Sequence, residues 1–88
     1  MKIKKGFVVR EVGGKQIAVA TGEASRTFNG MITLNGSARV LWDALTVGCD
    51  TDGLVSALTS VYDVSADAAR TDAEAFVEKL RAVGIIEE

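Results

Sequence analysis

The pattern of hydrophobic and polar residues in the first part of the chain favours β-strands. Residues 7–12 and 15–20 are two short runs rich in Val, Ile and Phe, and Gly13-Gly14 separates them. In the second run Ile17 and Val19 alternate with Gln16 and Ala18, which gives one apolar face. Two glycines at this place predict a hairpin turn, because the turns that suit antiparallel strands need positive φ angles. A third run with period two covers residues 27–34 and contains Phe28, Gly30, Ile32 and Leu34. The pattern predicts three antiparallel strands, with a polar loop over residues 21–29.

After residue 36 the apolar residues are spaced by three and four, which is typical of amphipathic helices. The three predicted stripes are Ala38, Leu41, Trp42 and Leu45, then Leu54, Ala57, Leu58 and Val61, then Ala69, Ala73, Phe76, Leu80 and Val83. Predicted caps and stops are Asn35 or Ser37 for the first helix, Gly48, Asp50 and Thr51 between the first and second, Ser65 for the third, and Gly84 after it. We expect Ile85 and Ile86 to fold back as an apolar tail.

This order predicts an α+β domain in which a three-stranded antiparallel sheet is followed by three helices, similar to a winged helix-turn-helix. With 88 residues, we expect one domain over residues 1–88. The basic N-terminal residues are followed by only three apolar ones, which is too short for a secretory signal or a membrane span. We therefore expect a cytoplasmic protein that has no membrane contact.

The composition argues against catalysis. The chain has no histidine and a single cysteine, Cys49, so a zinc or haem site and a base-activated thiol are not expected. Carboxylates such as Asp50 and Asp67 lie at predicted helix starts, where caps are needed, and Glu74 and Glu78 share a predicted solvated face. Nucleotide-binding glycine motifs do not occur. The sequence predicts no enzyme activity and no cofactor.

Charge is distributed unevenly along the chain. Residues 1–42 carry seven basic and two acidic side chains, whereas residues 43–88 carry three basic and ten acidic ones. A winged helix commonly binds DNA through a basic third helix, so a DNA-binding regulator is the main alternative function. Here the third predicted helix is net acidic, which disfavours nucleic acid. The split instead suggests that acidic partner segments approach from the sheet side.

Protein or peptide recognition is the remaining class. The third strand is short and, in this chain order, is a candidate edge strand that an extended peptide can pair with. Trp42, Phe28 and Phe76 are interpreted as core aromatics. Asp72 lies beside the apolar stripe of the third helix and is interpreted as a border residue that merits a test.

The ordered set of motifs resembles the PqqD family (coenzyme PQQ synthesis protein D). The resemblance lies in Leu34-Asn35-Gly36-Ser37-Ala38 followed by Leu41-Trp42 and Leu45, in Leu54 to Leu58, in Tyr62-Asp63-Val64, in the spacing from Asp72 through Phe76-Val77 to Leu80, and in Gly84-Ile85-Ile86. It extends from about Lys5 to Ile86. The segment from Gly22 to Asn29 shows no clear family pattern.

The resemblance implies a recognition element for the precursors of ribosomally synthesised, modified peptides (RiPPs). Members bind the leader of a precursor peptide as an added strand between the third strand and the third helix, and they present it to a tailoring enzyme, a radical SAM protein in the PQQ pathway. The implied peptide-binding residues are Met31, Ile32, Thr33, Arg70, Asp72, Ala73 and Val77. The implied partners are a leader peptide and a tailoring enzyme, and the implied oligomeric state is a monomer or a small homodimer.

Overall fold

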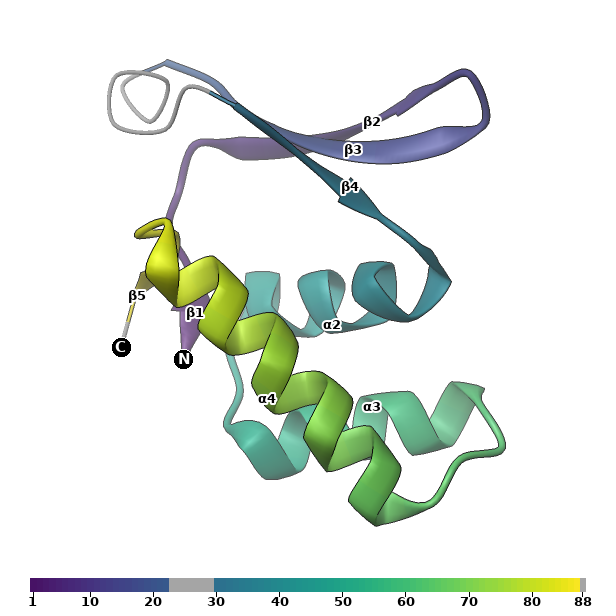
Figure 1. Ribbon diagram of the computed structural model, residues 1–88. Helices are drawn as coiled ribbons and strands as arrows, with labels where there is room; N and C mark the ends of the chain where they lie inside the picture. Colours follow the sequence, from purple (N-terminus) through teal and green to yellow (C-terminus); the bar gives the residue numbers. More distant parts are fainter. Residues whose placement is uncertain (23–29, 88) are drawn as a thin grey trace.

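The sheet and the helices occupy separate layers in the computed structural model, which describes residues 1–22 and 30–87. Strands β2 (Phe7–Val12), β3 (Lys15–Ala20) and β4 (Met31–Leu34) form an antiparallel sheet in the order β2-β3-β4. Beneath it lie α2 (Gly36–Val47), α3 (Thr51–Val61) and α4 (Ala66–Ala82), with α4 crossing in front of α2 and α3 (Figure 1). The predicted α+β order, a three-stranded antiparallel sheet followed by three helices, is confirmed.

The predicted hairpin is present and is built on the two glycines. Val12 pairs with Lys15, so Gly13 and Gly14 alone form the turn, with φ angles of 58° and 80°. Part of the predicted third strand is also present: β4 begins at Met31, while positions 27–29, including Phe28, lie outside the described residues. The expected loop also falls mostly within residues 23–29, outside that range.

Side-chain caps fix the start of every described helix. Asn35 accepts a hydrogen bond from the N–H of Ala38 at 2.8 Å, Asp50 from that of Gly53 at 2.8 Å, and Ser65 from that of Ala68 at 3.1 Å. Asn35 rather than Ser37 therefore caps α2, because Asn35 has the extended backbone of an N-cap residue and its side-chain oxygen faces the first free N–H groups, whereas Ser37 already lies inside the helix. Gly84, with φ of 78°, follows the end of α4 as expected.

The core lies between the sheet and the helices. Its largest fully buried side chains are Leu45, Leu54, Leu58, Leu80 and Ile85, and Trp42 is only 3% exposed. The Trp42 ring meets that of Phe7 edge to face, with 6.1 Å between ring centres. This confirms Trp42 as a core residue.

Two features of the C-terminal part differ from the sequence pattern. On α4 the buried positions include Val77, whereas Val83 is 47% exposed, because the helix ends at Ala82 before it can turn Val83 inward. The tail does more than fold back: β5 (Ile86–Glu87) pairs antiparallel with β1 (Lys2–Ile3), a second sheet that the sequence did not predict. It brings both ends of the described chain together (Figure 1).

Candidate functional site

Strand β4 lies at an edge of the three-stranded sheet, as the sequence suggested. It pairs with β3 on one side, and no other strand among residues 1–22 and 30–87 pairs with its second side. Ile32 and Leu34 point inward and are buried, whereas Met31 and Thr33 point to the outer face and are exposed. The chain therefore presents a short edge strand whose own side chains are divided between the core and the solvent.

A groove opens where β4 ends and α2 begins. Asn35 follows β4 directly, and the first turns of α2 face the middle of α4 across a hollow of about 380 Å³. We call it the α2–α4 groove; its lining residues are Asn35, Ser37, Ala38, Leu41, Asp72, Ala75, Phe76 and Lys79. It combines an apolar floor with polar groups at its rim, which is a common composition for binding sites.

A second hollow adjoins the α2–α4 groove on the side of α3. It has a volume of about 460 Å³ and shares Asn35, Ser37 and Asp72 with the groove. Its other walls include Leu58, Tyr62 and Val64. The Tyr62 hydroxyl lies so close to Gly36 that a Cβ there would sit 2.8 Å from it, so the glycine allows this close approach. The two hollows together make a longer depression along α4.

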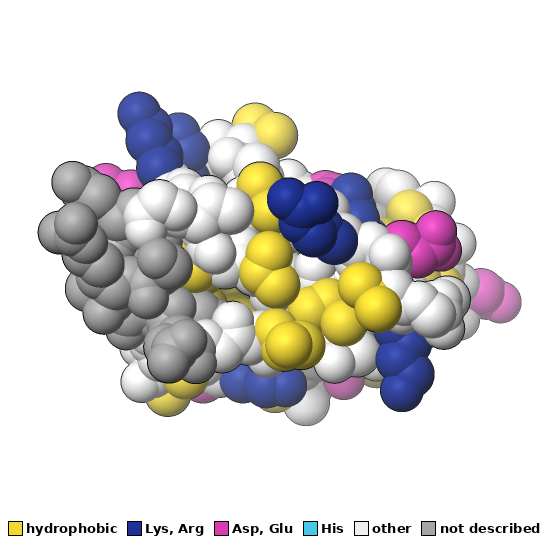
Figure 2. All heavy atoms as spheres, turned by 90° about the horizontal axis from the view of Figure 1, so that it is seen from above, with side chains coloured by type: hydrophobic (Ala, Val, Ile, Leu, Met, Phe, Trp, Pro, Cys, Tyr) yellow, Lys and Arg dark blue, Asp and Glu magenta, His cyan; other side chains and the backbone are white. Residues whose placement is uncertain are grey.

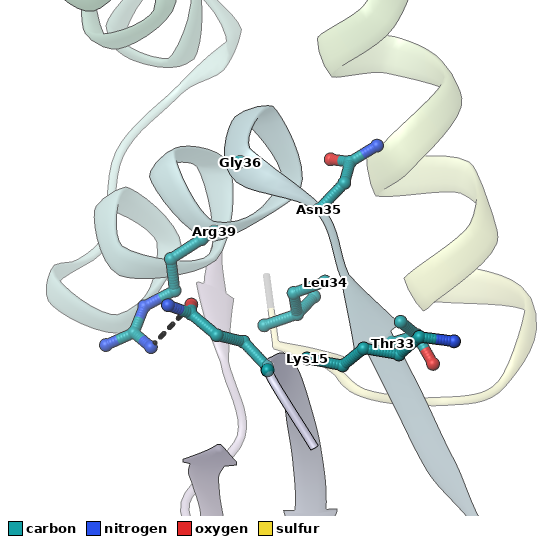
Figure 3. A pocket seen from close by; sticks show the side chains of 8 residues that line it. Lys15, Thr33, Leu34, Asn35, Gly36 and Arg39 are labelled. Carbon is teal, nitrogen blue, oxygen red and sulfur yellow. Dashed lines mark hydrogen bonds between the residues drawn. The ribbon is translucent and has the colours of Figure 1, made fainter. Parts of the chain in front are cut away.

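A third hollow of about 470 Å³ lies at the hairpin end of the sheet (Figure 3). Lys15, Thr33 and Arg39 stand around it, and it also touches Asn35 and Gly36. Arg39 is held in place because its Nη1 donates a hydrogen bond to Oε1 of Gln16 at 3.0 Å and its Nε donates one to Oδ1 of Asp43 at 2.8 Å. All three hollows therefore meet at the junction between β4 and α2.

The residues implied on the strand side fall in two classes. Met31 and Thr33 are exposed and Ile32 is 8% exposed, so Ile32 contributes its backbone, not its side chain, to the edge. On the helix side, Asp72 is exposed and lines both the α2–α4 groove and the hollow beside Tyr62. The structure thus brings Asp72 close to the end of β4.

The other implied α4 residues lie on different faces of the helix. Ala73 is fully buried and Val77 is 5% exposed, so both belong to the core. Arg70 faces α3, where its Nη2 donates to Oδ1 of Asp52 at 2.6 Å; that hydrogen bond, together with the charge of Asp52, raises the pKa of the Arg70 guanidinium. None of the three lines the α2–α4 groove.

Sequence reasoning missed the α4 residues that do line this groove: Ala75, Phe76 and Lys79. Together with Asp72 they follow helical spacing of three and four, so they share one face beside the buried stripe. This spacing is visible in the sequence, but Phe76 also falls on the predicted core stripe of the helix. The helix is in fact rotated so that Val77 is buried and Phe76 is half-buried at the groove.

Charged groups stand on both sides of Phe76 along α4. Asp72 lies four residues before it and Lys79 three residues after it, and neither forms an ion pair with another described residue. One end of the groove is therefore acidic and the other is basic. A bound segment would experience opposite charges at its two ends.

The described residues offer little for catalysis. Burial is the main cause that raises the pKa of the Cys49 thiol, with the Asp50 carboxylate adding to it and the N-terminal ammonium opposing it. The thiol is therefore less ionised at neutral pH than an ordinary cysteine. No cluster of metal-ligating side chains occurs among the residues that the structure describes. Within the same residues, no helix is long and apolar enough to cross a membrane.

Known proteins resemble this chain in sequence and in fold. The model of the family described as coenzyme PQQ synthesis protein D (PqqD) matches residues 12–86. A solved structure described as TbiB1 in complex with the TbiA(beta) leader peptide has the same fold, with a TM-score of 0.75 and 18% sequence identity. The alignment covers 99% of this chain and 95% of that one. The comparison with curated proteins gave no match.

Proposed function

The chain belongs to the PqqD family, and from this premise we propose that it is a non-catalytic module that binds the leader of a ribosomally made precursor peptide. In this proposal residues 1–88 act as a single domain that presents the peptide to a tailoring enzyme. Two observations outside the site support it. The structure of TbiB1, which shares the fold, contains a leader peptide. This chain has no histidine, and its single cysteine has a raised pKa, so it offers little for nucleophilic or acid–base catalysis.

The observation that carries the proposal is the open edge of β4 beside the α2–α4 groove. The backbone groups on the second side of β4 have no strand partner among the described residues. An extended peptide can complete such an edge with main-chain hydrogen bonds, while neighbouring pockets select its side chains. Both parts of this recognition mode are adjacent here, because the groove begins at Asn35, immediately after β4.

In this proposal the two alternating sets of side chains on the peptide have different surroundings. Successive side chains of an added strand point to opposite faces of the sheet. One set would lie on the outer face beside Met31 and Thr33, and the other would point toward α4. We propose that the inward set packs on Ala75 and Phe76, so apolar side chains at alternate positions are preferred.

The charges at the rim give the peptide a direction. Asp72 attracts a basic group at one end of the α2–α4 groove, and Lys79 attracts an acidic group at the other. A peptide bound in reverse would place like charges together, which costs affinity. We therefore revise the helix-side wall from Arg70, Ala73 and Val77 to Ala75, Phe76 and Lys79, and we retain Asp72.

The enzyme partner in this proposal is a radical SAM protein or another tailoring enzyme, and the product is PQQ or another modified peptide. The chemistry would take place in that enzyme, so this chain supplies affinity and position only. DNA binding is disfavoured by α4, where Arg70 contacts Asp52 and Arg81 contacts Glu78. The helix also carries more carboxylates than cations, which opposes binding to phosphates.

The test is a titration of the isotope-labelled protein with the precursor peptide encoded beside its gene, followed by NMR. We expect shifts over residues 31–35 and 72–79. Replacing Ala75 by Trp should fill the groove and weaken binding at least tenfold. The matched control is Ser56→Trp, which places the same ring on an exposed position of α3 outside every hollow described above.

Equal affinity of the Ala75→Trp and Ser56→Trp variants would contradict binding at the groove. Shifts confined to other residues, or their absence at high micromolar peptide, would contradict the proposed function as a whole. Circular dichroism of both variants establishes that each still folds.

A further inference from the structure

The three-stranded sheet has an outer face that none of the described helices covers (Figure 1). The strand register places paired residues on the same face, and burial of Ala18, Ile32 and Leu34 identifies the inner one. The opposite, outer face consists of Val8, Arg10, Val12, Lys15, Ile17, Val19, Met31 and Thr33. Most of these side chains are apolar, and Figure 2 shows hydrophobic side chains gathered over the middle of this face.

Such a composition is unusual for a sheet face that has no covering layer. Antiparallel sheets with one solvated face normally carry polar residues on it. Here Val12 is 59% exposed, Met31 66% and Val8 38%. A preference for β-branched residues in strands accounts for the valines but not for Met31. Contiguous exposed apolar surface of this kind marks an interaction site.

The charges on the outer face are all of one sign. Arg10 lies opposite Ile17 and Lys15 lies opposite Val12, so both cations are set among apolar side chains. Neither forms an ion pair with another described residue. Glu11 points to the inner side, and no outward position of the three strands holds a carboxylate. A complementary surface would be apolar and carry Asp or Glu.

We propose that the outer face is the docking surface for the modifying enzyme, whose matching surface is apolar and carries carboxylates placed against Arg10 and Lys15. This inference rests on the proposed function. It adds that the enzyme contacts a different face of the module from the one that holds the inward side chains of the peptide.

The geometry further couples the two partners. A peptide added to β4 extends the sheet by one strand, so its outward side chains continue the outer face beyond Met31 and Thr33. The enzyme would then dock on a surface made of both the module and its peptide. It should bind the peptide-loaded module more tightly than the free one, and by linkage the enzyme should tighten peptide binding by the same factor.

A second copy of this chain is a poorer occupant. Stacking two outer faces would bring Arg10 and Lys15 of one copy near those of the other, and like charges in a buried contact cost affinity. Stacking the outer face on the acidic helices of another copy gives a head-to-tail contact, which does not close into a dimer. Charge therefore favours a different protein.

The test compares two valines of nearly equal exposure. Val12 on the outer face is 59% exposed and Val61 at the end of α3 is 61% exposed. Binding of the purified modifying enzyme encoded with this chain is measured by biolayer interferometry, with and without the precursor peptide. We expect Val12→Glu and Arg10→Glu to weaken enzyme binding at least tenfold and Val61→Glu to leave it unchanged. Saturating peptide should strengthen enzyme binding to the unmodified module several-fold.

A second measurement avoids any loss of stability. A photo-crosslinking amino acid at position 12 should link the module to the enzyme, whereas the same group at position 61 should not. Peptide affinity is measured by NMR on every variant and should stay unchanged, which separates this inference from the proposed function. If the unmodified chain fails to bind peptide, the proposed function fails, and this inference fails with it.

With peptide binding intact, three results would overturn docking on the outer face. They are equal enzyme binding by Val12→Glu and Val61→Glu, no binding of the enzyme to the module, and self-association of the unmodified chain that Val12→Glu abolishes. An enzyme affinity that peptide does not change would overturn the shared surface.

Discussion

The helical part of this domain buries the largest side chains and caps its helices, whereas the sheet part leaves edges and one face exposed. The largest fully buried side chains are Leu45, Leu54, Leu58, Leu80 and Ile85, all from the helices or from the segment after α4. Each described helix starts at a side-chain cap. Within the part of the chain that the structure describes, the sheet buries only one face, and β2 and β4 are both edges. We therefore expect stability to reside mainly in the helical part, so that the sheet can offer an edge and a face to partners.

Truncating a core side chain should have the largest effect, and it tests where the stability resides. Leu45→Ala removes three heavy atoms from a fully buried site between α2 and the rest of the core. The lost contacts and the remaining cavity should lower the free energy of unfolding by about 3 kcal/mol. Val12→Ala on the outer face should cost less than about 1 kcal/mol, the span of strand propensities. Urea denaturation of both variants measures the difference.

A similar loss in both variants would mean that the outer face of the sheet also stabilises the isolated domain, which contradicts a stability concentrated in the helical part. Such a result would also weaken the case that this face is kept for an enzyme.

The parts of the fold that follow local rules were predictable from the sequence. The hairpin followed from Gly13-Gly14 between two β-favouring runs, and the starts of the helices followed from capping residues before apolar stripes, with Asn35 or Ser37, Asp50 and Ser65 as candidates. These signals are local, because a turn or a cap is decided by a few neighbouring residues. The sheet order could also be inferred, since short connections join neighbouring strands.

Long-range arrangements were not predictable in the same way. Strands β1 and β5 are two residues each and exist only because the chain ends meet, which no local pattern encodes. The rotation of α4 was likewise decided by packing: Ala73 and Val77 fit against the other helices, so the larger Phe76 lies half-buried at the groove. Because Val77 rather than its neighbour Phe76 turns inward, the proposed helix-side wall lies on a different face of α4 from the one that the sequence implied.

Two glycines, one in each part, provide an intermediate test. Gly13 in the hairpin has φ of 58° and nothing near its missing Cβ, so only the backbone conformation opposes a side chain. Gly53 in α3 has helical geometry, but a Cβ there would lie 2.9 Å from Cβ of Cys49 and 3.3 Å from Oδ1 of Asp50. We expect alanine to destabilise the domain by about 1–2 kcal/mol at either site, through left-handed strain at Gly13 and a disturbed cap at Gly53.

Second substitutions distinguish these two causes in thermal unfolding. Asparagine tolerates the left-handed conformation, so Gly13→Asn should be nearly neutral. Cys49→Gly removes the opposing Cβ and should recover part of the stability lost in Gly53→Ala, as a double-mutant cycle would measure. If the stability changes of Cys49→Gly and Gly53→Ala were fully additive, contact with Cys49 would not be the reason that position 53 requires glycine.

The smallest expected effect concerns the polar contact that joins the two parts. Arg39 on α2 donates to Gln16 on β3 at 3.0 Å, while buried apolar residues such as Ala18, Ile32 and Leu34 pack the inner face of the sheet into the core. A single hydrogen bond in a partly exposed place contributes about 0.5–1 kcal/mol. A double-mutant cycle of Arg39→Ala and Gln16→Ala should give a coupling of that size. Repeating the cycle in an Asp43→Ala background is the control, because Asp43 contacts Arg39 but not the sheet. A coupling well above the cost of Gly13→Ala would show that polar contact, and not the buried apolar face, holds the sheet in place; a coupling of the expected size means that the buried apolar face supplies most of the attachment, with the edge and the outer face of the sheet available to partners.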